Sequence, residues 1–185
     1  MAIVVAQDLT QVKEAILPAE VRSVPMPTID DIELARALHV LAVAHWIGGV
    51  AFVTLVALPL ARANPDGEKG FALFEAIEKR FAAQVRFSIP VAGLAGLWMT
   101  WRLDLWSTFR EPSFWWMDAM VVLWTLFMVI VFVVEPREHA RIAARAAHDP
   151  GGVLTKVFRS HLVLLAAASI TILGAVAGAH GGLFR

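Results

Sequence analysis

The sequence predicts an all-α integral membrane protein, a four-helix transmembrane bundle with short amphipathic interfacial helices. Of the 185 residues, 58% are hydrophobic and only 17% are charged, and the mean hydropathy is +0.67. A single soluble domain of this size could not bury so much apolar surface. The apolar residues also fall into four runs, each long enough to supply the about 20 residues of helix that cross a bilayer. The lipid bilayer is therefore the expected surroundings of the chain.

Charge and cysteine content exclude several classes of protein. The 16 basic residues balance the 16 acidic ones, whereas nucleic-acid binding requires a basic excess and disorder usually accompanies a large net charge. The absence of cysteine excludes disulfides, thiolate metal sites, iron–sulfur clusters and covalent c-type haem attachment. Any metal or cofactor must then be held by histidine, methionine, carboxylate or backbone groups.

The sequence divides into a polar N-terminal tail, residues 1–31, and a transmembrane domain, residues 32–185. The tail lacks the basic start, long apolar run and small-residue cleavage site of a signal peptide. Residues 8–17 fit one short amphipathic helix, and Pro25 and Pro27 predict an extended linker after it.

The predicted spans cover residues of about 34–60, 81–102, 113–135 and 158–182. Asp30 or Asp31 is a suitable N-cap for the first span. Residues 71–80 are expected to form a separate amphipathic helix at the interface before the second span. Pro90 is tolerated inside that span because neighbouring helices can satisfy the carbonyl that proline leaves free. A basic segment after the third span is expected to form a helix that faces solvent or lipid headgroups.

Basic residues in the loops predict the orientation. The loop after the first span and the loop after the third span together carry more lysine and arginine than the opposite face. By the positive-inside rule, the face with these two loops is cytoplasmic. We therefore expect a multi-pass protein of the bacterial inner membrane with both termini outside the cytoplasm.

The histidines differ in their predicted depth. At 1.5 Å per residue, His39 and His180 come out roughly 5 Å below the outer face, and His45 roughly 13 Å below it. The other histidines lie near the inner face or in the basic loop: His139, His148 and His161.

Chemical donors collect in the outer half of the predicted bundle. Two axial haem ligands need similar depth on different helices, and His39 meets this condition with His180, Met117 or Met120. The donors of this layer are His39, His45, Met99, Met117, Asp118, Met120 and His180. An intramembrane histidine is costly and is expected to have a functional partner. The alternative for His39 is a hydrogen bond to a neighbouring helix, and for the methionines it is ordinary core packing.

Two charged side chains near the spans each have two interpretations. Arg86 either extends to lipid headgroups on the inner side or contacts a haem propionate or substrate. Asp118 either pairs with Arg36 or Arg102 or belongs to a proton or metal path.

A family resemblance is carried by residues 37–49, ALHVLAVAHWIGG, with a Leu-His start and a Trp-x-Gly-Gly end. This stretch resembles the first membrane helix of the CopD-like superfamily, which includes the copper-resistance D-type membrane proteins and, more distantly, the HemJ-type protoporphyrinogen oxidases. Residues 74–80, FEAIEKR, and Pro90 with Gly93 and Gly96 are similar to the HemJ pattern, so the likeness extends over much of the first three spans. The resemblance implies an inner-membrane protein that binds haem b or handles copper.

The sequence also departs from this pattern. In the HemJ-type proteins, a histidine at the position of His39 works with a lysine in the third helix, where Met120 stands here and no lysine is present. This difference disfavours protoporphyrinogen oxidation. It permits a His/Met haem or copper site, since imidazole and thioether suit both haem iron and Cu(I). His45 is an addition to the family pattern.

We therefore expect a haem b-binding electron-transfer protein that works with a redox partner. His39 would be one axial ligand, and the second would be His180, His45 of a second copy in a homodimer, or Met120, with Arg86 a further cofactor contact. One alternative is a copper transport or resistance protein with a Cu(I) relay through His39, His45, Met117, Met120 and His180. Another is an accessory or assembly subunit of a larger membrane complex, docking through the tail and the glycines Gly174, Gly178 and Gly182 of the fourth span.

Overall fold

The computed structural model describes residues 30–179. Contacts within the chain separate Met1–Asp31 from Ile32–Arg185, and the helical fold belongs to the second of these parts. The predicted tail helix at residues 8–17, His180 and Gly182 lie outside the described residues.

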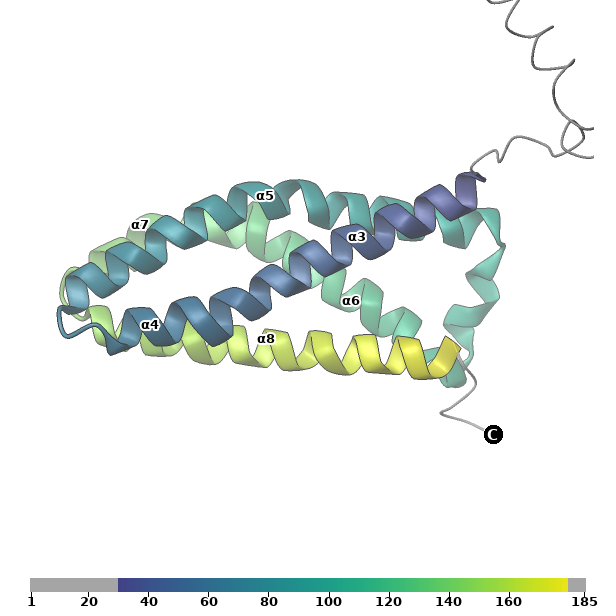
Figure 1. Cartoon of the computed structure of the whole chain (residues 1–185). Helices are drawn as coiled ribbons and strands as arrows, with labels where there is room; N and C mark the ends of the chain where they lie inside the picture. The colour runs from purple at the N-terminus through teal and green to yellow at the C-terminus, as the bar shows by residue number, and fades with distance from the viewer. Residues whose placement is uncertain (1–29, 180–185) are drawn as a thin grey trace, which may run out of the picture. The chain divides into compact units, whose positions relative to one another are not determined.

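Between residues 30 and 179, every regular element is helical (Figure 1). The α-helices are α3 (Asp31–Phe52), α4 (Leu58–Ala63), α5 (Gly67–Arg102), α6 (Trp115–Val129), α7 (Glu135–Ala146) and α8 (Pro150–Ala179). Two π-helical turns, η1 (Val53–Ala57) and η4 (Ile130–Val134), join α3 to α4 and α6 to α7. Two 3-10 turns, η2 (Leu105–Arg110) and η3 (Pro112–Phe114), connect α5 to α6.

Three of the continuous helical segments are long and apolar enough to cross a membrane. They are Asp31–Ala63, Pro112–Ala146 and Pro150–Ala179, which correspond to the first, third and fourth predicted spans. The helical class is thus confirmed for the described residues, together with three apolar segments of membrane-spanning length. Helix α5 is not one of these segments, since charged side chains fill its first half and Arg86 and Pro90 come after them.

One predicted boundary is wrong. Residues 71–80 and the second predicted span form one uninterrupted helix, α5, because no glycine or proline lies between Gly70 and Pro90. Asp66 caps this helix by accepting a hydrogen bond from the Lys69 backbone N–H at 3.1 Å. The basic segment after the third span forms a helix as predicted, α7, which continues the third segment through η4.

Each π-helical turn directly precedes a helix whose first turn contains a proline. Pro59 and Pro136 occupy these positions in α4 and α7. Proline has no N–H to offer the carbonyl four residues earlier, and its ring pushes that carbonyl away. Widening the preceding turn to a π turn accommodates this loss without ending the helix.

Two clusters of buried side chains hold the helices together. The main cluster joins α3, α5, α6, η4 and α8 around Trp46, whose ring packs edge-on against Phe127 with 4.8 Å between centroids. The second cluster lies towards the turn between α4 and α5 and contains Val53, Leu58, Ala61, Phe74 and Leu154. Figure 1 shows α3 crossing obliquely between α5 and α8, and the helical segment that α3 begins contributes to both clusters.

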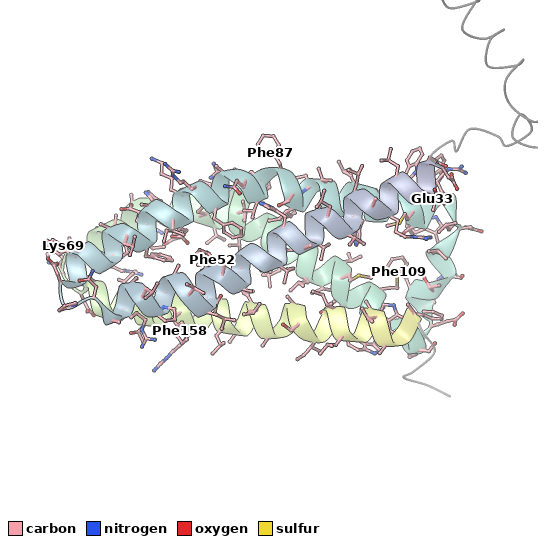
Figure 2. All side chains as sticks on the ribbon, in the orientation of Figure 1. Glu33, Phe52, Lys69, Phe87, Phe109 and Phe158 are labelled. Atoms are coloured by element: carbon pink, nitrogen blue, oxygen red, sulfur yellow. The ribbon has the colours of Figure 1, made fainter. Side chains whose placement is uncertain are left out.

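Many large apolar side chains remain exposed on the outside of these helices. Phe87, which projects outwards in Figure 2, is 77% exposed, and Leu173 is 69% exposed. Similar side chains occur on α3 and α6. An apolar outer surface of this extent is typical of a chain that contacts lipid or another apolar partner.

Candidate functional site

His39 bridges α3 and α5 through its imidazole ring. Its Nδ1 atom lies 2.7 Å from the carbonyl oxygen of Ala92, and the side chain is half-buried. A carbonyl oxygen can only accept a hydrogen bond, so Nδ1 carries a proton, and in the neutral ring Nε2 then keeps its lone pair. A metal-ligating histidine usually has this arrangement, in which the second ring nitrogen donates to a carbonyl or carboxylate.

Gly96 makes room for the His39 ring. A Cβ atom at this position would lie 3.3 Å from His39 Cε1 and 3.4 Å from Nδ1, which is tighter than ordinary van der Waals contact. The glycine, one turn after Ala92, therefore allows the imidazole to approach the α5 backbone closely.

Trp124 makes a similar contact from α6. Its indole N–H donates to the carbonyl of Ile89 at 2.9 Å, and a Cβ atom at Gly93 would overlap the indole ring. The stretch of α5 around Pro90 thus accepts hydrogen bonds from side chains of two other helices. His39 and Trp124 together fix α3 and α6 against this stretch.

Two buried polar groups near this stretch lack a partner within the described residues. They are the indole nitrogen of Trp46 and the hydroxyl of Ser88. Trp46 belongs to the main cluster, and Ser88 directly precedes Ile89. Buried polar groups are normally hydrogen-bonded, so each of these two atoms leaves a hydrogen bond unmade within the described residues.

His45 lies apart from His39 in the structure. It is exposed, its Nε2 donates to Gln84 Oε1 at 3.1 Å, and its ring lies 6.4 Å from that of Phe81. Gln84 and Ala92, the partners of the two histidines, are eight residues apart on α5, or about 12 Å at 1.5 Å per residue. One copy of the chain therefore does not bring the two imidazoles together.

The methionines of α6 lie nearer the start of that helix than Trp124. Trp124 packs at Gly93, close to the level of His39 and Ala92. Met120 is one turn before Trp124, about 6 Å along the axis, and Met117 is about 10 Å before it. Both methionines are half-buried. Of the two, Met120 is the closer to the level of His39.

Arg86, a further charged candidate, is engaged with the start of α7 and not with His39. Its guanidinium lies 3.4 Å from Glu135 Oε1, in the turn where α7 begins. Asp118 lies one turn into α6 and is exposed. No group of three or more His, Cys, Asp or Glu side chains between residues 30 and 179 is arranged to hold a metal ion.

Sequence reasoning overlooked a cluster of acidic side chains between α5 and α7. Glu75 lies 3.5 Å from His139 Nε2, and Glu78 lies near both Glu75 and Glu135. Burial, and then the charges of Glu135 and Glu75, raise the pKa of Glu78 to about 7. The available signal was the spacing of Glu75 and Glu78, which puts both on one face of a helix.

The glycines of α8 are covered from within the chain. A Cβ atom at Gly174 would overlap Trp115, and one at Gly178 would overlap Trp116. Both tryptophans belong to α6. These two positions therefore serve the packing of α6 on α8, as the small-residue spacing predicts, and are not open to a docking partner.

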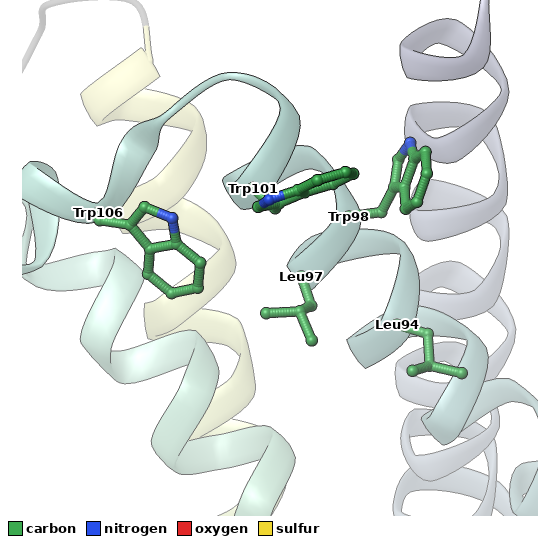
Figure 3. A pocket seen from close by; sticks show the side chains of 5 residues that line it. All are labelled: Leu94, Leu97, Trp98, Trp101 and Trp106. Carbon is green, nitrogen blue, oxygen red and sulfur yellow. The ribbon is translucent and has the colours of Figure 1, made fainter.

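An open apolar hollow lies where α5 meets η2 (Figure 3). It is lined by Leu94, Leu97, Trp98, Trp101 and Trp106. In Figure 3 the indole nitrogens of Trp101 and Trp106 face each other across the opening. Exposed tryptophans with an apolar body and a polar N–H are typical of the boundary between membrane and water.

Comparisons with protein-family models, with curated proteins and with solved structures find no match to this chain. The likeness to the CopD-like superfamily consequently stays a prediction from the sequence motifs.

Proposed function

We propose that the chain is a four-helix transmembrane bundle of the bacterial inner membrane, with both termini outside the cytoplasm. Three segments have the length and composition to span, and α5 packs against α4, α6 and α8. The exposed apolar side chains supply a lipid-facing surface. The tryptophans of the hollow at the α5–η2 end would lie at the outer interface, where indole rings are favoured.

Within this bundle, we propose that the protein binds haem b and transfers electrons, with His39 as an axial ligand. The observation that carries this proposal is the 2.7 Å contact between His39 Nδ1 and the Ala92 carbonyl. It selects the neutral tautomer with its lone pair on Nε2 and holds the ring against α5, which is what a ligating imidazole requires. His39 therefore has the donor chemistry of one axial ligand of a haem iron.

The second axial ligand would be Met120, His45 or His180. Met120 is the candidate nearest in level to His39 on the described helices. His45 would have to come from a second copy, and His180 is outside the described residues. Bound haem supplies a one-electron couple, and the chain sets its potential through ligand identity and burial. The Trp46 indole and the Ser88 hydroxyl, buried without a hydrogen-bond partner among residues 30–179, are the polar groups nearest to this stretch of α5 that a cofactor could engage.

The test is the visible absorption of the protein purified from membranes, recorded oxidised and then reduced with dithionite. We expect a Soret shift and an α band on reduction, both lost in His39→Ala and kept in His139→Ala, a matched change at an exposed histidine. Imidazole added to His39→Gly should restore part of the spectrum. Absence of any haem signal from the native protein would overturn the proposal, and stoichiometric copper that disappears in His39→Ala and Met120→Ala would replace haem with Cu(I) handling.

A further inference from the structure

Basic side chains gather where α4 packs against the start of α8. The guanidinium of Arg62 in α4 lies 4.8 Å above the ring of Phe158 in α8 (Figure 2). Arg159 directly follows Phe158, and Lys156 comes three residues before Arg159, which puts Lys156 and Arg159 on one face of α8. All three basic side chains are exposed. We call Arg62, Lys156 and Arg159 the basic cluster.

No carboxylate of these elements balances the charge of the basic cluster. Residues 53–63, which include α4, and the whole of α8 contain no aspartate or glutamate. The acidic side chains of the adjacent turns, Asp66 and Asp149, accept backbone N–H hydrogen bonds at the starts of α5 and α8. The basic cluster forms no ion pair within the described part of the chain. Three cations on one exposed surface therefore favour an anion from outside the chain.

The contact with Phe158 also determines how Arg62 is presented. The aromatic ring attracts the face of the guanidinium, whereas the N–H donors of a guanidinium lie along its edge. These donors form a planar fork that matches the oxygens of a phosphate or a carboxylate. Arg62 is thus held in place by an apolar contact that leaves its hydrogen-bonding edge to an anion.

Exposed apolar side chains adjoin the basic cluster on one side. Helices α4 and α8 run in opposite directions (Figure 1), so the residues before Arg62 and the residues after Arg159 lie on the same side of the cluster. Leu55, seven residues before Arg62, is 60% exposed, and Leu162, three residues after Arg159, is 43% exposed. Farther along α8, Leu173 is exposed as well. The surface therefore suits a ligand in which an anionic group is joined to apolar chains.

We propose that the basic cluster binds the phosphate of an anionic phospholipid, whose acyl chains lie against the exposed apolar side chains of α8 and of the segment Asp31–Ala63. Arg62 and Arg159 donate to the phosphate oxygens, and Lys156 adds a further positive charge. In the proposed bundle this end of the helices faces the cytoplasm, where basic side chains next to a span attract anionic headgroups. The inference rests on the proposed membrane arrangement, which labelling of single cysteines tests separately, and does not depend on haem.

The test is native mass spectrometry of the full-length protein in detergent, incubated with phosphatidylglycerol or with phosphatidylethanolamine of the same acyl chains. We expect the native protein to retain phosphatidylglycerol in preference to the zwitterionic lipid. The double variant Lys156→Gln/Arg159→Gln should bind phosphatidylglycerol more weakly by about fivefold for each charge removed. Arg110→Gln, which changes an exposed arginine of η2 beyond the far end of α5, should bind it as the native protein does.

Further measurements separate a phospholipid from other anions. Inorganic phosphate in excess should not displace the lipid, because it lacks the acyl chains. Arg62→Gln should weaken lipid binding more than Arg62→Lys, which keeps the charge, and circular dichroism checks that each variant keeps its helices. Equal retention of the two lipids, unchanged binding by the double variant, or displacement by inorganic phosphate would overturn the proposal. Tighter binding of polyglutamate than of phosphatidylglycerol would also overturn it and would indicate an acidic protein segment as the partner.

Discussion

Trp124 donates its indole N–H to the carbonyl of Ile89, the residue immediately before Pro90. Proline lacks the N–H that continues a helix, yet α5 runs through this position without a break. Trp124 and His39 attach to the backbone on either side of Pro90, at Ile89 and Ala92. The turn of α5 around Pro90 thus accepts one side-chain hydrogen bond from α3 and one from α6.

Gly93→Ala should destabilise the protein by about 1–3 kcal/mol, the usual cost of overpacking a close contact. The added Cβ would overlap the Trp124 indole and displace it from Ile89. The matched control is Gly48→Ala, because nothing lies within 4 Å of a Cβ there and alanine favours a helix. Thermal unfolding in detergent measures both, and equal melting temperatures for the two variants would contradict the contact.

Gly96→Ala tests whether Ala92 positions His39 for a ligand. The Cβ would press on Cε1 and Nδ1 of His39 and weaken the hydrogen bond to the Ala92 carbonyl. Loss of such a supporting contact typically lowers metal affinity by about 10–100-fold. We expect lower haem occupancy and a shifted reduction potential with little change in stability. Unaltered occupancy and potential would mean that the His39 contact only packs the helices.

The sequence predicted the helical class well because an apolar run of about 20 residues indicates a spanning helix whatever the exact order of its residues. The sequence did not predict how the helical segments are connected. Residues 67–102 form one helix because no glycine or proline stands near residue 80. The change from polar to apolar residues at this point suggested a boundary between two helices. The π turns before Pro59 and Pro136 arise from a backbone adjustment that hydropathy does not encode.

Sequence reasoning also selected His39 but could not identify its partner. A carbonyl such as that of Ala92 exists at every residue, so only the packing of α3 on α5 distinguishes it. His45 looked equivalent by residue type, whereas the structure turns it to Gln84 on an exposed surface. The acidic cluster was overlooked because its members are 57 residues apart along the chain, from Glu78 to Glu135.

Gly178→Val should separate α6 from α8. The side chain would overlap the indole of Trp116, and the resulting strain should lower the melting temperature in purified protein without any partner present. A docking role for this glycine predicts instead normal stability and loss of a co-purifying protein. Comparison of the melting temperature and the co-purified material in the native and variant protein separates these outcomes.

The pH dependence of stability should change in Glu78→Gln. The pKa of Glu78 is raised from 4.5 to about 7 in the fold, so the folded chain binds this proton more tightly than the unfolded chain. The group therefore costs stability progressively as the pH rises from 4.5 to about 7, and the cost is constant above that range. Relative to the native protein, Glu78→Gln should gain stability across this interval. A pH-independent difference between the two unfolding curves would contradict the raised pKa.

Single cysteines can determine the topology, because the chain has none of its own. We expect a membrane-impermeant maleimide to label Ser107→Cys, in η2, in intact bacteria. Ala144→Cys in α7 and Glu68→Cys at the start of α5 should react only after the cells are opened; all three positions are exposed. The pair Glu68 and Ser107 tests α5 specifically: if this helix did not cross the membrane, the two would be labelled alike. Reversed labelling of all three would invert the orientation but keep the spans, since charge bias sets direction while apolar length sets crossing.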